Sequence, residues 1–165
     1  MREAGEPRSG CPINAAVEAF GDRWSLIVLR DIVFGDRRYF RELQGGSLEG
    51  IASNILADRL KRLVELGLLS REDARPGQRA RYSLTEPAIQ LVPVFAQLGS
   101  WGLRHRPTTA ALRVRAELLE QGGPELWQEF MDELRHSHLG SQSPAQSPSV
   151  RERLNGAYLA ATNSS

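Results

Sequence analysis

The sequence is poor in two residue types that often mark reactive or modified sites. It has one cysteine, Cys11, and only one of its 21 cationic residues, Lys61, is a lysine. A single cysteine excludes a disulfide within the chain and is typical of a reducing compartment. The histidines His136 and His138 are two positions apart on a predicted helix and point to different sides, so we expect no metal site there.

Long apolar runs are also missing. No stretch approaches the roughly 18 consecutive apolar residues that a membrane-spanning helix needs. The first ten residues, MREAGEPRSG, lack the apolar segment of a secretory signal. We therefore expect a cytoplasmic protein with no membrane partner, and a disordered N-terminus over residues 1–10.

Motifs of catalysis are absent as well. The sequence contains no nucleophile–base spacing, phosphate-binding loop or paired-acid motif. We expect neither an enzyme nor a bound cofactor. The composition, 41% hydrophobic and 25% charged over 165 residues, is that of an ordinary globular protein that can bury a core without disulfides.

The charge is unevenly distributed along the chain. Residues 11–107 hold 14 Lys and Arg against 11 Asp and Glu, a net of +3. Residues 108–165 hold 5 against 7, a net of −2. This asymmetry permits an anionic partner for the first part of the chain.

Apolar periodicity predicts four helices before residue 67. PINAAVEAF and RWSLIVLRDIVFG carry apolar residues at helical spacing, and Asp22 can cap the second of them. RYFRELQGG predicts a short third helix. The fourth, SNILADRLKRLVE, begins at the capping residue Ser53, carries leucines on one face and polar residues on the other, and stops at Gly67.

The pattern then changes to that of a β-hairpin. LLSRED and ARYSLT are β-compatible runs on either side of a Pro-Gly pair. Alternation along the second run turns Tyr82 and Leu84 inward and Arg79 and Arg81 outward. The hairpin is therefore expected to expose arginines.

The remaining residues predict a helical extension. A fifth helix covers EPAIQLVPVFAQLGSWGLRHR, and Pro93 inside it requires a late start or a kink. Residues 108–138 predict two helices separated by Gly122 and Gly123, residues 139–149 a Ser/Pro linker, and residues 150–165 a short helix and tail. We expect these acidic side chains to form a solvated face: Glu117, Glu120, Glu125 and Glu129.

Helices followed by a basic hairpin are the plan of a winged helix-turn-helix, which is mostly α with a small β-hairpin. We assign it to residues 11–107. A helix of about 14 residues, about 20 Å long, fits the major groove of DNA. Ser53 and Asn54 at its start would reach base edges, while Arg59, Arg62 and the hairpin arginines would contact phosphates.

These residues resemble the HxlR family of bacterial winged-helix transcription regulators, which are relatives of the MarR group. The resemblance rests on CPINAAVEAFGDRWSLIVLRDIVFG, YFRELQ, EGIASNILADRLKRLVELGLLSR, RARYSLT and LGSWG. It implies a homodimer, paired through the first and fifth helices, that binds an inverted repeat. Together with the helix pattern it gives these predicted DNA-binding residues: Ser53, Asn54, Ala57, Asp58, Arg59, Lys61, Arg62, Arg75, Arg79 and Arg81.

The resemblance also implies a dimer interface and a redox role. The interface residues that it implies are Ile13, Val17, Phe95, Leu98 and Trp101. Cys11 matches a cysteine with which some members of the family sense oxidants or electrophiles. A helix N-terminus favours the reactive thiolate, and the alternative is a small, partly buried residue that only fits its site.

We therefore predict a sequence-specific DNA-binding transcriptional regulator, a repressor of nearby genes that acts as a homodimer on an inverted-repeat operator. Its expected partners are double-stranded DNA and a second copy of the chain, and an unknown small-molecule effector is left open. The alternative is a winged-helix protein–protein interaction module whose working surface is the acidic C-terminal region.

Overall fold

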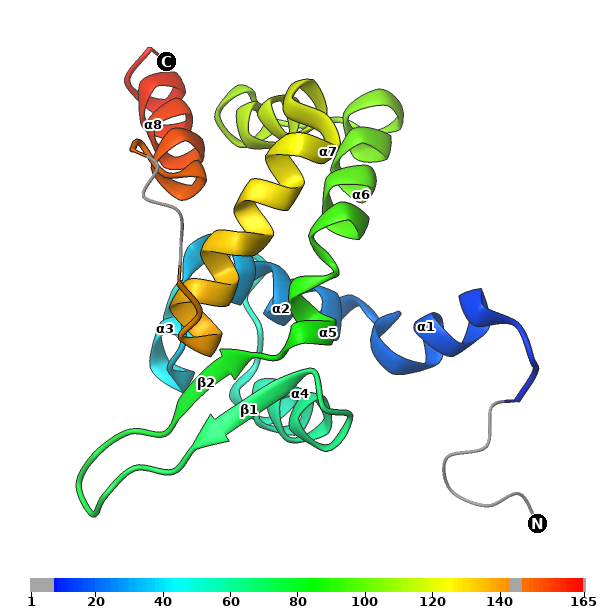
Figure 1. Cartoon of the computed structure of the whole chain (residues 1–165), viewed down its shortest axis with the longest axis vertical. Coiled ribbons are helices and arrows are strands. Elements are labelled where there is room, and N and C mark those ends of the chain that lie inside the picture. Colours follow the sequence, from blue (N-terminus) through cyan, green and yellow to red (C-terminus); the bar gives the residue numbers. More distant parts are fainter. Residues whose placement is uncertain (1–7, 143–146, 165) are drawn as a thin grey trace. The chain divides into compact units, whose positions relative to one another are not determined.

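The computed structural model describes residues 8–142 and 147–164. The chain forms two compact units, residues 1–83 and 84–165 (Figure 1). Parts of the predicted disordered N-terminus and Ser/Pro linker, residues 1–7 and 143–146, lie outside the described residues. The described helices include none that combines the length and the apolar character needed to cross a bilayer.

The first unit contains four helices and a β-hairpin. The helices are α1 (Pro12–Phe20), α2 (Arg23–Gly35), α3 (Phe40–Gly45) and α4 (Ser53–Glu65). Strands β1 (Leu69–Glu72) and β2 (Arg81–Leu84) pair in a two-stranded sheet, and Leu84 already belongs to the second unit. The predicted winged helix-turn-helix, mostly α with a small hairpin, is confirmed.

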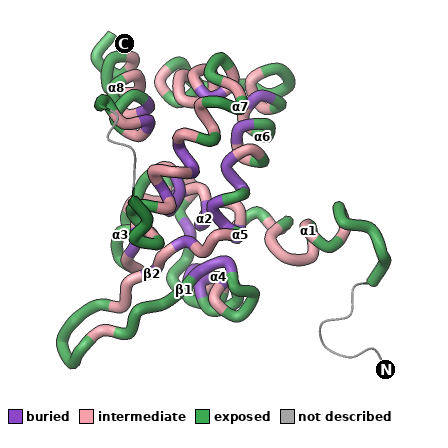
Figure 2. Tube along the Cα trace, in the orientation of Figure 1, coloured by how far each residue is buried: buried purple, intermediate pink, exposed green. Residues whose placement is uncertain are grey.

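The core of the first unit lies between α2 and α4 (Figure 2). Leu56, Leu60 and Leu63 of α4 are almost completely buried, as the leucine spacing predicts. The α2 residues buried with them are Val28, Leu29, Ile32 and Val33. Burial of each such side chain is worth about 2 kcal/mol, so this seam holds α4 in place and leaves its polar face in solvent.

The ends of the helices follow the predicted signals with one exception. Asp22 caps α2, since its Oδ2 accepts a hydrogen bond from the Ser25 N–H at 3.0 Å. Gly67, with φ +74°, follows the end of α4. The prediction that Ser53 caps α4 is wrong: Ser53 is already helical, and the cap residue is Ala52, whose carbonyl accepts from the Leu56 N–H at 2.9 Å.

The second unit contains α5 (Glu86–Ile89), α6 (Val92–His105), α7 (Ala110–Leu139) and α8 (Val150–Asn163). Pro93 lies in the first turn of α6, so the predicted fifth helix is divided into α5 and α6. The two predicted helices of residues 108–138 are the two arms of α7, which breaks at Gly123 (φ 61°, ψ −159°) before Pro124. The Trp127 indole N–H donates to the Leu119 carbonyl at 2.8 Å across this break.

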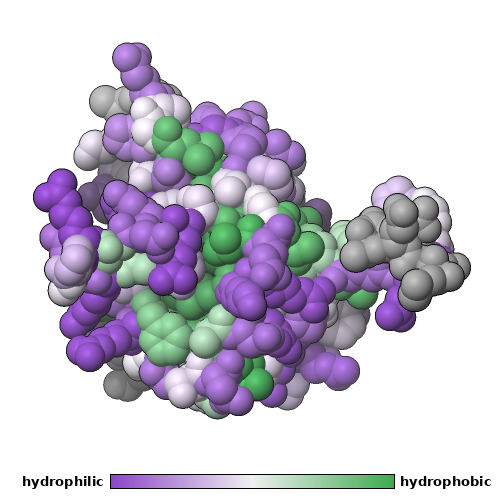
Figure 3. Space-filling model, turned by 90° about the horizontal axis from the view of Figure 1, so that it is seen from below, coloured by the Kyte–Doolittle hydropathy of each residue, from purple (hydrophilic) through white to green (hydrophobic). Residues whose placement is uncertain are grey.

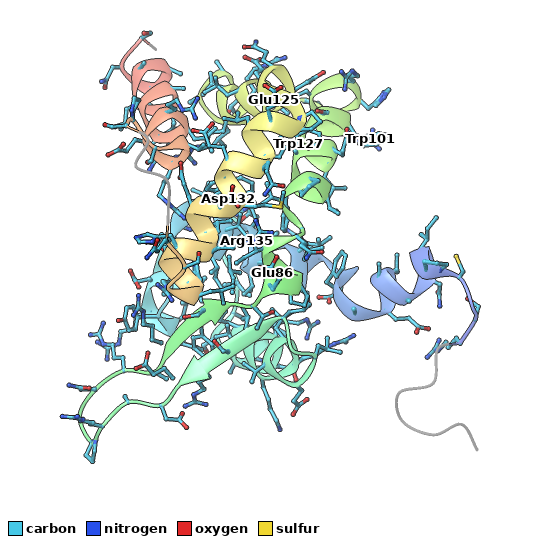
Figure 4. All side chains as sticks on the ribbon, in the orientation of Figure 1. Glu86, Trp101, Glu125, Trp127, Asp132 and Arg135 are labelled. Carbon is cyan, nitrogen blue, oxygen red and sulfur yellow. The ribbon has the colours of Figure 1, made fainter. Side chains whose placement is uncertain are left out.

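The extension is packed onto the rest of the second unit. α7 packs against α5, α6 and α8, and its side chains Phe130 and Leu134 are fully buried. Arg135 donates to both Glu86 of α5 and Asp132, each within 2.7 Å (Figure 4). The His138 Nδ1 accepts from the Leu84 N–H at 3.0 Å. These bonds fix the end of α7 to the beginning of the unit.

The predicted acidic face of the extension is in contact with solvent but is not purely acidic, since its ion-paired glutamate side chains remain 27–39% exposed. Glu117, Glu120 and Glu129 form ion pairs within the second unit, with Arg113, Arg104 and Arg153 respectively. Glu125 is exposed and forms no ion pair with a described residue. The acidic composition of the extension is therefore largely matched by arginines that the sequence places elsewhere in the same unit.

Candidate nucleic-acid interface

The face of α4 opposite its buried leucines is polar and exposed. Asn54, Asp58 and Lys61 lie along it, as their spacing predicts. Ser53 and Ala57 are exposed beside them. Figure 3 looks onto the side of the first unit that carries α4 and the hairpin, and hydrophilic side chains cover much of that side.

Arg59 of α4 is committed to two carboxylates. Its Nε donates to Asp22 Oδ2 at 2.8 Å and its Nη1 to Asp58 Oδ2 at 2.5 Å. Partial burial opposes ionisation of Asp22, but the Ser25 and Arg59 hydrogen bonds outweigh it and lower the pKa of Asp22 to about 2. Hydrogen bonding to Asp22 in turn raises the pKa of Arg59. Arg59 therefore ties the start of α2 to the middle of α4.

Arg62 also makes a bond within the first unit. Its guanidinium donates to the Glu18 carbonyl of α1. Lys61, by contrast, forms no side-chain hydrogen bond or ion pair with the residues that the structure describes. Of the three cations predicted on α4, Lys61 is the one whose charge is not shared with a protein group.

The hairpin presents arginines to solvent. Arg75 and Arg79 lie in the loop between β1 and β2, on either side of the turn at Gly77 (φ +86°), and both are exposed. Arg81 opens β2 and is half-buried. Within residues 8–142 and 147–164, no acidic side chain pairs with any of these three arginines.

A buried arginine that the sequence did not single out supports the hairpin. The Arg38 Nε donates to the Tyr82 carbonyl at 3.1 Å, and the Tyr82 N–H donates back to the Arg38 carbonyl at 2.8 Å. A second guanidinium nitrogen donates to the Ser83 hydroxyl. Burial lowers the pKa of Arg38, and the neighbouring Arg81 cation lowers it further. The base of the hairpin thus concentrates positive charge.

A second set of charged residues, which the sequence did not single out, fixes the segment that leads into α4. Arg30 of α2 makes a two-pronged ion pair with Glu49, at 2.7 and 2.9 Å, and also bonds Asp31. Arg37 contacts Asp31 at 3.3 Å and donates to the Gly46 carbonyl at 2.7 Å. The hydrogen bond from Arg30 lowers the pKa of Glu49. Local periodicity carries no signal for the pair of Arg30 and Glu49, because its members lie 19 residues apart in sequence.

Two apolar surfaces carry the predicted dimer residues. α1 buries none of its residues, and Ile13 and Val17 are 76% and 57% exposed. On α6 of the second unit, Leu98 and Trp101 are 50% and 54% exposed, while Phe95 is half-buried. Both helices therefore leave large apolar side chains exposed to solvent.

Cys11 is exposed and occupies the cap position of α1. It is a free thiol in this chain, so the alternative of a partly buried, space-filling residue does not describe the structure. Its redox role stays a prediction. Among the described residues, no group of three or more His, Cys, Asp or Glu side chains is arranged to hold a metal ion.

Proteins similar to this chain carry a helix-turn-helix. An uncharacterised HTH-type transcriptional regulator of Mycobacterium tuberculosis is 36% identical over 102 residues, 59% of this chain and 61% of the relative. One from Synechocystis is 33% identical over 94 residues, 56% of this chain and 67% of the relative. The chain thus spans about three fifths of the length of the mycobacterial relative.

Solved structures agree with this comparison. PA1607, described as a candidate transcription factor, superposes with a TM-score of 0.55 at 33% identity, over 61% of this chain and 69% of that one. The redox regulator HypR in its oxidised form gives a TM-score of 0.52 at 25% identity, over 59% of this chain and all of that one. The model of the HxlR-like helix-turn-helix family matches residues 19–110, more than half of the sequence. The chain therefore belongs to the HxlR-like helix-turn-helix family.

Proposed function

We propose that the protein is a sequence-specific DNA-binding transcriptional regulator that acts as a homodimer on an inverted-repeat operator and represses nearby genes. One observation carries this proposal. A helix held by buried leucines leaves a polar face in solvent, and the adjoining hairpin carries three arginines without an acidic partner among the described residues.

The dimensions suit a duplex. α4 has 13 residues and is therefore about 20 Å long, which fits the major groove. Its first turn, with Ser53 and Asn54, would meet base edges, and Lys61 would meet a phosphate. Arg75, Arg79 and Arg81 would follow the backbone or enter the adjacent minor groove. Arg59 and Arg62, which bond protein groups, would contribute charge near the phosphates rather than free guanidinium donors.

The homodimer is supported by the exposed apolar side chains of α1 and α6. Ile13, Val17, Leu98 and Trp101 would each be covered by the second copy. A two-fold dimer presents two copies of α4 to one face of the duplex, so its half-sites should lie about 34 Å apart or at a multiple of that spacing. A dimer seated on an operator close to a promoter would exclude the transcription machinery, which favours repression.

The hairpin arginines are expected to bind phosphates. Replacing Arg75, Arg79 and Arg81 together by alanine should weaken binding to all duplexes and reduce the slope of log K against log salt by up to about 5, because a homodimer loses six arginines and each lost phosphate contact contributes roughly 0.9. Fluorescence anisotropy at several salt concentrations, with fragments of the genome that the wild-type protein captures, measures both quantities.

Arg113→Ala is the matched control, since this arginine lies on α7 in the other unit and pairs with Glu117. It should leave the salt slope unchanged. An unchanged slope in the triple variant would rule out the hairpin as a phosphate-binding element. If the wild-type protein bound no DNA at either low or moderate salt, the protein–protein module would become the better hypothesis.

A further inference from the structure

We propose that Asp58 is the residue of α4 that selects a cytosine in the major groove, and that Arg59 is the residue that positions it. This inference rests on the proposed function, because it assigns one base to one side chain of the DNA-facing helix. It also gives Arg59 a task other than binding a phosphate.

The Asp58 carboxylate is exposed to solvent, and hydrogen bonds hold it in position. Its side chain is 65% exposed and lies one helical turn after Asn54. Oδ2 accepts from Arg59 at 2.5 Å, Arg59 donates to Asp22 at 2.8 Å, and Asp22 accepts from the Ser25 N–H at 3.0 Å. The carboxylate therefore stands at the end of a series of hydrogen bonds that begins at the first turn of α2.

The second oxygen of Asp58, Oδ1, is available to a ligand. None of the described residues donates a side-chain hydrogen bond to it. A lone carboxylate would be repelled by the phosphates on both sides of a groove. Arg59, which also pairs with Asp22, offsets part of this repulsion through its contact with Oδ2, and Oδ1 remains as an acceptor.

An acceptor with no donor discriminates strongly among the four bases. Guanine presents O6 and N7 in the major groove and thymine presents O4, so both would oppose a carboxylate oxygen. Adenine offers its N6 amino group, but the acceptor N7 lies beside it. Cytosine offers the N4 amino group beside a neutral C5–H. Cytosine is therefore the base that Asp58 fits best.

The experiment begins with a library of duplexes that contain a random segment, from which the wild-type protein selects its preferred sequence. Duplexes carrying each of the four base pairs at every position of that sequence are then compared for Asp58→Asn, Asp58→Ala and wild type. At one position in each half-site, wild type should prefer cytosine by roughly tenfold. Asp58→Ala should lose this preference, and Asp58→Asn should move it toward adenine, whose N6 and N7 match an amide.

Arg59→Lys tests the positioning role, because a lysine cannot bridge two carboxylates as a guanidinium fork does. It should relax the cytosine preference in the wild-type background and leave base preference unchanged in the Asp58→Ala background. A purely structural role of Arg59 would alter both backgrounds equally. Lys61→Gln is the control: it should weaken binding at all sequences by the same factor.

The proposal is overturned if Asp58→Ala retains the wild-type preference at every position, or if the base that depends on Asp58 is not cytosine. These results leave the proposed function intact, because wild type has then still selected a sequence. A wild-type protein that selects no sequence from the library would instead overturn the proposed function.

Discussion

Asp22 serves two structures with one carboxylate. It caps the first turn of α2 through Ser25 and accepts the Nε–H of Arg59 from α4. A cap residue is worth about 1 kcal/mol, and a partly exposed ion pair roughly 0.2–1 kcal/mol. Asp22 therefore links the stability of the helix pair to the orientation of the exposed side chains of α4, for which contact with DNA is proposed.

The pKa of Asp22 makes this contribution depend on pH. The pKa falls from 3.8 to about 2 in the folded chain, so the unfolded chain binds the proton more readily. The stabilisation is thus complete above about pH 4 and is lost as the pH falls toward 2. Asp22→Asn, which keeps a capping oxygen, should lower the free energy of unfolding at pH 7 by about 0.5–1 kcal/mol.

Chemical denaturation at several pH values between 2 and 7 checks this prediction. The difference between wild type and Asp22→Asn should shrink steadily below pH 4. A difference that stays constant down to pH 2 would mean that Asp22 is not held ionised by Ser25 and Arg59. Asp73→Asn supplies a control with little effect, since among the described residues the Asp73 carboxylate pairs only with the exposed Arg71.

At the level of elements, the backbone N–H groups at the start of the C-terminal helix α8 are satisfied by side-chain hydrogen bonds. Ser149 and Glu152 form a capping box. Glu133 of α7 accepts from the backbone N–H groups of Val150 and Arg151. The first N–H groups of a helix lack partners within it. At the start of α8, the Glu133 and Glu152 carboxylates accept hydrogen bonds from most of these groups. α8 is therefore a docked part of the second unit.

Removing the contribution of α7 should loosen α8 without unfolding the protein. We expect Glu133→Ala to cost about 1 kcal/mol locally and to speed amide exchange in α8 by roughly fivefold, while α2 and α4 stay unaffected. Hydrogen exchange read by mass spectrometry measures this. Glu125→Ala, which changes an exposed glutamate on the same helix, should have no such effect. Uniform acceleration over the whole chain would contradict the assignment.

Elements were predictable where the signal is local. The leucine spacing of α4, the cap at Asp22, the late start of α6 at Pro93 and the break of α7 near Gly123 each depend on a few adjacent residues. Contacts between residues far apart in the sequence could not be predicted. Asp22 and Arg59, for example, are 37 residues apart, and no periodicity connects them. Arg38 escaped notice for the same reason, since only the folded hairpin supplies its acceptors.

At the scale of the whole molecule, the chain of 18.3 kDa is proposed to work as a pair. Replacing Leu98 and Trp101 together by aspartate places two charges on an apolar surface that the second copy would bury, so the variant should be a monomer at micromolar concentration. Analytical ultracentrifugation distinguishes this from a wild-type particle of twice the chain mass. Operator affinity should fall with it, because two half-sites can no longer be bound as one.

Leu159→Asp provides the comparison, as Leu159 of α8 is similarly exposed, at 58%. It should leave the sedimentation of the wild-type particle unchanged. If the wild-type protein itself sediments as a monomer, the apolar side chains of α1 and α6 are not covered by a second copy of the chain. If the double variant remains a dimer, the subunits pair through other residues.

The exposure of Lys61 has a practical consequence. It is the sole lysine of the sequence, and it stands on the polar face of α4. An amine-reactive reagent would therefore place a covalent label on one side chain besides the α-amino group. The rate at which Lys61 is labelled, measured with and without a duplex, would therefore report whether DNA covers the polar face of α4.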